Sequence, residues 1–234
     1  MGVNSAHSLA TVILNQALAL KKQHHLPMLE EWQKERARVV KAIEEGLSES
    51  SVAIHLETPP AIHFPISSLA ELINGKLTLN GRPLGALAEL FQAEHALMAL
   101  VDAHTAIRQE FEGQSPEYVI PRYLALETPV GQDTRYQDIR LGFVSVLDDL
   151  LFFADVLSKD LLTYGEGVRN YVPWRERKRL PTLNVSLGVV PGNEYLIPRH
   201  AHHKEWHDSF TMVEETRRSF WHCVTSRFKR LKGG

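Results

Sequence analysis

The chain has 234 residues, 44 % of them hydrophobic and 23 % charged, and a formal net charge of −2 at pH 7. That composition excludes overall disorder and a fibrous repeat, and it is typical of a globular protein with a hydrophobic core. The only cysteine, Cys223, excludes an intramolecular disulfide framework and a cysteine-based zinc site. It is typical of a reducing compartment, so we expect a cytoplasmic protein.

The first residues show no charged-then-apolar signal pattern, and no segment has about eighteen apolar residues in succession. We therefore expect neither export nor a membrane span. No break in composition divides the chain, and no internal repeat is visible. One domain over residues 1–234 is the expected organisation.

The small net charge conceals an uneven distribution along the chain. Residues 1–164 contain 13 Lys or Arg and 21 Asp or Glu, whereas residues 165–234 contain 13 and 7. The two parts thus carry net charges of −8 and +6. A basic C-terminal third indicates an anionic partner, which could be nucleic acid, a membrane surface, another protein or the acidic part of the same molecule.

Helical spacing of apolar residues predicts two helices at the start of the chain, over residues 8–23 and 28–47. Pro27 lies between them, where it would be a first-turn proline of the second helix. From residue 51 the apolar residues alternate with others. This pattern predicts two short strands or an extended arm over residues 51–65.

The middle of the chain is predicted to contain a brief helix over residues 67–73, a strand over 76–79 and a long helix over 84–111. The Asn80-Gly81 pair after the strand is typical of a tight turn. Apolar residues of the long helix lie largely on one side, and we expect that side to pack on the first helix. A connection with three prolines follows: Pro116, Pro121 and Pro129.

Residues 135–162 are the longest run with the pattern of one buried helix. Its apolar residues recur at steps of three and four, and a second apolar row covers much of the opposite side, so we expect this helix to be central. The remaining polar stripe contains Asp148, Asp155 and Lys159. It is either a solvated strip closed by an Asp155–Lys159 pair, or a paired-carboxylate metal or acid/base site.

After residue 162 we expect an irregular stretch, one strand over residues 183–190 and a last helix from about residue 202 or 208 to residue 231. The predicted fold is therefore mainly α: a single helical domain with a bundle-like core of about five helices and a small β element. The basic third of the chain, residues 165–234, belongs to that domain.

Basic side chains cluster in two segments of this third, over residues 175–179 and 217–232. The second segment predicts an amphipathic helix, whose charges are either merely solvated, bound to phosphates, or placed beside a partner's groove. Trp174 and Trp221 could stack on bases. The residues predicted to contact nucleic acid are Arg175, Arg177, Lys178, Arg179, Arg217, Arg218, Arg227, Lys229 and Arg230.

Four histidines occur within residues 200–207. His203 and His207 have the i,i+4 spacing that places two imidazoles on one helix face, and His200 is nearby, so a metal site is one hypothesis. Lys204 stands where zinc proteases have their glutamate, and a further ligand would have to come from elsewhere. The alternatives are an ordinary helix start and a pH- or anion-sensitive patch.

Arg217 and His222 are separated by four residues on a predicted helix. This segment resembles the motif of HEPN-type ribonucleases, in which a dimer brings two arginines and two histidines around a phosphodiester without a metal. The resemblance covers six residues, and Arg218 stands where that family has a small polar residue. It implies Arg217 and His222 as catalytic residues.

Taken together, these patterns favour a non-catalytic intracellular protein that binds RNA or DNA, or serves as an accessory subunit, through its basic C-terminal region. No cofactor is expected. The alternatives are a metal-independent HEPN-like ribonuclease, a metal hydrolase that uses the histidine cluster, and an adaptor that binds other protein subunits.

Overall fold

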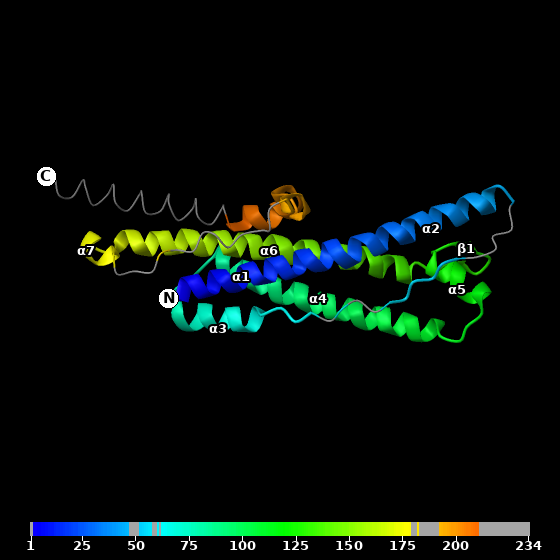
Figure 1. Ribbon diagram of the computed structural model, residues 1–234, viewed down its shortest axis with the longest axis horizontal. Helices are drawn as coiled ribbons and strands as arrows, with labels where there is room; N and C mark the ends of the chain where they lie inside the picture. The colour runs from blue at the N-terminus through cyan, green and yellow to red at the C-terminus, as the bar shows by residue number, and fades with distance from the viewer. Residues whose placement is uncertain are drawn as a thin grey trace.

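The computed structural model describes residues 2–46, 52–57, 60, 62–178, 182 and 192–210. Within this part the protein is mainly α-helical with a small two-stranded sheet, which confirms the predicted fold class (Figure 1). The elements are α1 (Gly2–Leu20), α2 (Leu26–Glu44), α3 (Ile66–Lys76), α4 (Arg82–Phe111), α5 (Pro116–Tyr123), β1 (Glu127–Thr128), β2 (Gly131–Gln132), α6 (Arg135–Tyr171) and α7 (Trp174–Arg177).

Helix α6 begins at Arg135, as predicted, and lies at the centre of the bundle. Helices α1 and α4 both run along it in the opposite direction, with α3 at one end of the molecule and α5 and the hairpin at the other (Figure 1). Phe143, Leu150 and Leu157 of α6 are fully buried. Because α6 is apolar on two sides, it accepts both neighbours, and α4 packs chiefly on α6 rather than on α1 as we expected.

Helix α6 continues nine residues beyond its predicted end, through Gly165 and Gly167 to Tyr171. Each glycine disfavours a helix by about 1 kcal/mol relative to alanine, so the prediction stopped before them. The end of the helix is closed by Arg177, whose Nε donates to the carbonyl of Val172 at 2.7 Å and whose Nη2 donates to that of Asn170 at 2.7 Å. These bonds satisfy carbonyls that would otherwise have no partner at a helix end.

Helices α1 and α2 form one continuous rod, because a π turn over Lys21–His25 joins them without a break. The amide of Leu26 donates to the carbonyl of Lys21, five residues back. This wider turn accommodates Pro27, whose ring in a regular α-helix would collide with the carbonyl four residues earlier. The predicted interruption before Pro27 was therefore wrong: the proline widens the helix instead of ending it.

The small sheet lies elsewhere than predicted. No strand is assigned within residues 52–57, 62–64 or 77–79, and the hairpin occupies Glu127–Gln132, in the predicted proline-containing connection. Residues 52–57 bond to side chains instead of to a strand, since the amide of Ala53 donates to Glu35 Oε1 at 3.0 Å and that of His55 to Tyr123 Oη at 3.2 Å. The strand predicted over residues 183–190 lies outside the described residues.

Residues 204–210 are helical, in agreement with the predicted start of the last helix. They pack on the bundle: Trp206 lies edge-on to Phe153, with ring centroids 5.0 Å apart. A Cβ at Gly85 of α4 would lie 2.4 Å from Cζ of Phe210, so the absence of a side chain there allows this close approach. The continuation of that helix beyond residue 210 lies outside the described part of the chain.

Candidate functional site

Two aromatic and two basic side chains are exposed together where α6 ends and α7 begins. Tyr171 is 92 % exposed and Trp174 66 %. The guanidinium carbon of Arg175 lies 5.6 Å from the centre of the Trp174 ring, and Lys178 follows one turn later. Neither Arg175 nor Lys178 forms an ion pair with a described residue. We call these four residues the α6–α7 tip.

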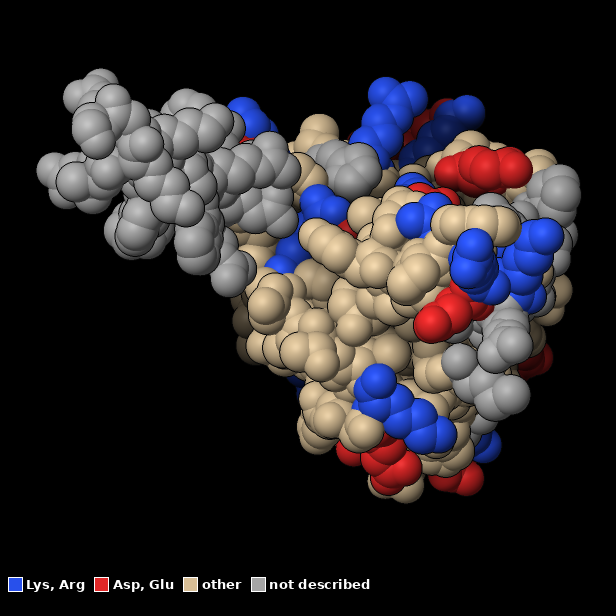
Figure 2. Space-filling model, turned by 90° about the vertical axis from the view of Figure 1, so that its left-hand side faces the viewer, with Lys and Arg blue, Asp and Glu red and all other residues tan. Residues whose placement is uncertain are grey.

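Arg177, the third predicted contact residue in this region, is half-buried and caps α6 with two of its donors. On the end of the molecule that carries α7, Lys and Arg side chains occur in several separate places with Asp and Glu among them (Figure 2). The other predicted contact residues lie outside the described residues: Arg179, Arg217, Arg218, Arg227, Lys229 and Arg230. The same holds for His222, the second residue of the HEPN-like motif.

Two of the four histidines within residues 200–207, His203 and His207, contact side chains of the bundle. His203 stacks on Phe152 of α6, with ring centroids 4.0 Å apart, and its Nε2 lies 3.6 Å from Asp149 Oδ1. His207 Nε2 lies 3.4 Å from Arg82 Nη1. Among the residues that the structure describes, no three His, Cys, Asp or Glu side chains are grouped to hold a metal; the side chain of His200 lies outside them.

Asp155 and Asp148, the two carboxylates of the polar stripe of α6, pair with different lysines. Lys159 Nζ lies 2.6 Å from Asp155 Oδ2, which confirms the predicted pair. Asp148, however, pairs with Lys21 from the π turn, a lysine whose side chain is only 9 % exposed and which also donates to the carbonyl of Leu196. The interpretation of Asp148 as part of a solvated strip was wrong, because its partner comes from a helix distant in sequence.

Near the opposite end of α6, a cavity of about 220 Å³ opens between α2, residues 52–57, the end of α5 and the start of α6. Arg140 lies in its wall, and we call it the Arg140 cavity. The other lining residues are Met28, Glu31, Trp32, Lys34, Glu35, Ala53, His55 and Tyr123.

Arg140 is only 2 % exposed. Its Nη2 donates to the carbonyl of His55 at 3.1 Å and to Tyr136 Oη, and its Nη1 lies 3.4 Å from the sulfur of Met28. Its Nε has no partner among the described residues, and no described carboxylate pairs with the guanidinium. The charge of this buried arginine is therefore not neutralised by any described residue.

Two buried histidines, His25 and His104, interact electrostatically with this arginine. His25 stacks on Phe143 with ring centroids 4.4 Å apart, and His104 of α4 is fully buried. Burial, with a smaller contribution from the charge of Arg140, lowers the pKa of each to about 4. Burial also raises the pKa of Tyr136. At neutral pH these groups are therefore uncharged, and Arg140 provides the only full charge of the cluster.

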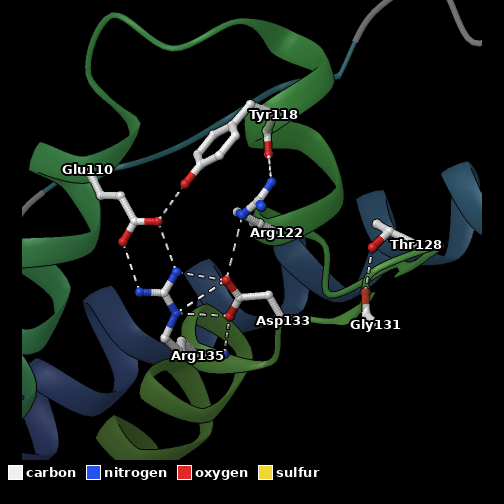
Figure 3. A network of polar contacts seen from close by, with 7 residues as sticks. All are labelled: Glu110, Tyr118, Arg122, Thr128, Gly131, Asp133 and Arg135. Atoms are coloured by element: carbon white, nitrogen blue, oxygen red, sulfur yellow. Dashed lines mark hydrogen bonds and ion pairs between the residues drawn. The ribbon is translucent and has the colours of Figure 1, made fainter.

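Arg122 and Arg135, two surface arginines at this end of the molecule, form ion pairs, in contrast to Arg140. Arg135 donates to both oxygens of Glu110, at 2.8 and 2.9 Å, and to Asp133 at 2.7 Å (Figure 3). Tyr118 donates to Glu110, and Arg122 lies 3.9 Å from Asp133. Hydrogen bonds from Arg135 lower the pKa of Glu110 and of Asp133. This network connects the ends of α4 and α5 to the start of α6 and leaves its charges balanced.

Comparison with known proteins gives no relative. No protein-family model, no curated protein and no solved structure matches this chain.

By length and composition, α4 meets the requirements for a membrane-spanning helix, and it is the one helix in the described part of the chain that does. This is weak evidence, because the core helix of a soluble protein meets the same requirements. In the bundle α4 packs along α6. The expectation of no membrane span stays a prediction.

The Arg140 cavity was missed by sequence reasoning, although a signal for its arginine exists. Tyr136, Arg140, Phe143 and Leu147 follow one another at steps of four, three and four, so Arg140 continues an apolar stripe of α6. A charged residue in such a stripe is almost never fully buried unless it is paired. The walls of the cavity come from distant segments, and no local pattern would have revealed them.

Proposed function

We propose that the protein is a non-catalytic, intracellular nucleic-acid-binding protein, an accessory subunit of a larger assembly, which contacts single-stranded nucleic acid through the α6–α7 tip and the basic residues after it. The observation that carries this proposal is the exposure of Tyr171 and Trp174 beside Arg175 and Lys178. Aromatic faces next to unpaired cations are the elements with which proteins bind single strands without sequence preference.

Each part of the tip has a distinct role in this proposal. Stacking of a base on an exposed aromatic ring contributes about 1–3 kcal/mol and accepts any base. Arg175 and Lys178 neutralise backbone phosphates and release counterions, which makes binding sensitive to salt. The net charge of +6 over residues 165–234 supplies attraction at longer range.

The proposal is tested by the fluorescence anisotropy of labelled 15-nucleotide poly(U) and poly(dT) with the full chain, from 50 to 200 mM salt. We expect affinity to fall steeply with salt, and the double variant Arg175→Glu, Lys178→Glu to weaken binding and reduce the salt slope by about 2, one for each phosphate contact. Trp174→Ala should weaken binding by about 1–3 kcal/mol. The control is Lys41→Glu, an exposed site on α2, which should leave affinity unchanged.

Two results would contradict the proposal. Affinity that is indifferent to salt, or reduced equally by the control, would remove the electrostatic argument. Cleavage of the RNA during the measurement, abolished by His222→Ala, would favour the HEPN-like ribonuclease instead.

A further inference from the structure

We propose that the Arg140 cavity binds a small organic carboxylate with an apolar body, and that Arg140 recognises its carboxylate group. This site is independent of the proposed nucleic-acid contact. From Arg140 to Tyr171, α6 spans 31 residues, or about 46 Å at 1.5 Å per residue. The cavity and the α6–α7 tip therefore lie near opposite ends of α6, a helix that runs along the long axis of the molecule (Figure 1).

The first argument is the charge of Arg140. A guanidinium removed from water is strongly disfavoured unless an anion and hydrogen bonds replace the water. In this protein the acceptors for Arg140 are a carbonyl, a phenol oxygen and a thioether sulfur, which is a weak acceptor, and its Nε has none among the described groups. A carboxylate from outside would supply the missing negative charge.

The two carboxylates that line the cavity do not supply it. Glu35 accepts hydrogen bonds from Arg38 at 2.8 Å and from the amide of Ala53 at 3.0 Å, and the Arg38 hydrogen bond lowers its pKa. Glu31 is exposed on α2 and forms no ion pair with a described residue. Both carboxylates line the cavity and would repel an anion bound there. A ligand with one negative charge is therefore favoured over a phosphate dianion.

The walls of the cavity determine the rest of the ligand. Met28, Trp32 and Tyr123 provide apolar and aromatic surface. A cavity of about 220 Å³ is smaller than the roughly 300–1,000 Å³ of sites for drug-sized molecules, so the ligand has on the order of ten non-hydrogen atoms. A short aryl or branched alkyl chain on the carboxylate fits this description.

Hydrogen bonds hold the walls in place before a ligand arrives. Trp32 Nε1 donates to the carbonyl of Tyr123 at 2.7 Å, and the amide of His55 donates to Tyr123 Oη at 3.2 Å. The carbonyl of His55 in turn accepts from Tyr136 Oη at 2.9 Å and from Arg140. A preformed site loses little conformational freedom on binding, which favours affinity for a small ligand.

The probe is 3-phenylpropionate, titrated into the full chain and followed by isothermal titration calorimetry. Its matched controls are 3-phenylpropanamide, which has the same shape without the charge, and inorganic phosphate. We expect the acid to bind with a dissociation constant of about 0.1–1 mM. The amide should bind at least about tenfold more weakly, because its carbonyl oxygen accepts from Arg140 without the negative charge of a carboxylate, and phosphate should not compete.

Arg140→Met removes the charge but keeps an apolar side chain of similar length, and it should weaken binding of the acid at least about tenfold. Arg36→Met, which removes a charge nearby on α2 without lining the cavity, should not. The α6–α7 tip variant Arg175→Glu, Lys178→Glu should also leave the affinity unchanged. Failure of this site is thereby distinguished from failure of the nucleic-acid proposal.

Three results would overturn the inference. They are no binding of the acid at 10 mM, equal affinities for acid and amide, and unchanged affinity in Arg140→Met. The comparison of acid with amide uses the wild-type chain alone, so it decides the question even if Arg140→Met does not fold.

Discussion

At the scale of single residues, the pair Lys21–Asp148 joins a buried lysine to its counter-ion, and we expect it to matter for stability. Asp148→Ala would leave a lysine with a 9 % exposed side chain without its counter-ion, and we expect the free energy of unfolding to fall by about 3 kcal/mol. Asp155→Ala, on the same stripe, removes a partner of the exposed Lys159 and should lower the free energy of unfolding by about 0.5 kcal/mol. Urea denaturation of both variants measures the difference.

A second variant tests the cause of that loss. Adding Lys21→Met to Asp148→Ala removes the unpaired charge, so it should recover most of the stability. If the double variant is as unstable as Asp148→Ala, packing around the pair, and not its charge, is responsible.

The buried histidines give the protein a predictable response to acid. The pKa of His25 and of His104 is lowered to about 4 in the folded state, against 6.5 in the unfolded chain. A base with a lowered pKa contributes stability above pH 6.5, and this contribution is lost as the pH falls towards 4. We expect roughly 3 kcal/mol for each histidine over this interval, measured by denaturation at several pH values.

Asp149 acts in the opposite direction over part of this interval. Burial raises its pKa to about 6, so its contribution is present below about pH 4 and is lost as the pH rises through 6. Its side chain is 39 % exposed, and solvent screening reduces the effect, so the two histidines dominate. His104→Leu should flatten the acid dependence, whereas His95→Leu, at an exposed site, should not; equal slopes in the two variants would contradict the assignment.

At the scale of elements, the sequence was most informative where an apolar pattern runs over many residues. The starts of α4 and α6 fell within two residues of their predicted positions. Errors arose at prolines and glycines: Pro27 suggested a break in a continuous rod, Pro121 concealed α5, and Gly165 with Gly167 suggested an early end of α6. Local propensity contributes about 1–3 kcal/mol at such positions, and packing outweighed it.

The two candidate sites differ in how far the sequence could predict them. Trp174, Arg175 and Lys178 of the α6–α7 tip are close together in the chain, so the sequence alone was enough to propose them as contact residues. Tyr171 was not among the predicted residues, and its exposure is visible only in the structure. The Arg140 cavity is formed by α2, residues 52–57, α5 and α6. Contacts between such distant segments leave no periodic pattern, and only the polar character of Arg140 within an apolar stripe pointed to it.

Replacing Gly167 or Gly46 by alanine should change the free energy of unfolding in opposite directions. A Cβ at Gly167, inside α6, would meet no atom within 4 Å. Gly167→Ala should therefore raise the free energy of unfolding by about 1 kcal/mol, the difference in helix propensity. A Cβ at Gly46 would also meet open space, but the residue has φ = +69°, so Gly46→Ala should destabilise by about 1 kcal/mol. Thermal denaturation distinguishes these opposite signs.

At the scale of the whole molecule, α6 fixes the separation between the two candidate sites. Because one uninterrupted helix carries both Arg140 and Tyr171, the cavity and the α6–α7 tip are held at the two ends of a rigid element. The charge is balanced differently at these ends. At the α5 end, Arg122 and Arg135 form ion pairs with Glu110 and Asp133, whereas the α6–α7 tip presents two basic side chains without ion pairs to described residues.

Because of the π turn between α1 and α2, the rod has one residue more than a regular α-helix would need to keep the buried side chains of both halves facing α6. From Ala17, the buried positions recur every four residues to Leu29, and each such step overshoots a regular α-helical turn by about 40°. The wider turn absorbs the excess and keeps both halves of the rod in phase with α6. Deletion of Gln23 from this turn, together with Pro27→Ala to remove the collision with the backbone, should therefore preserve the fold.

A deletion of the same size elsewhere in the rod should not be tolerated. Removing the exposed Val12 from the regular part of α1 would rotate every residue before it by about 100° and turn its buried face away from α6. Circular dichroism and thermal denaturation of the two deletions compare them directly. The prediction fails if both unfold alike, and success would show that the π turn, unlike the regular part of α1 at Val12, allows the residue count to change without altering which side chains reach the core.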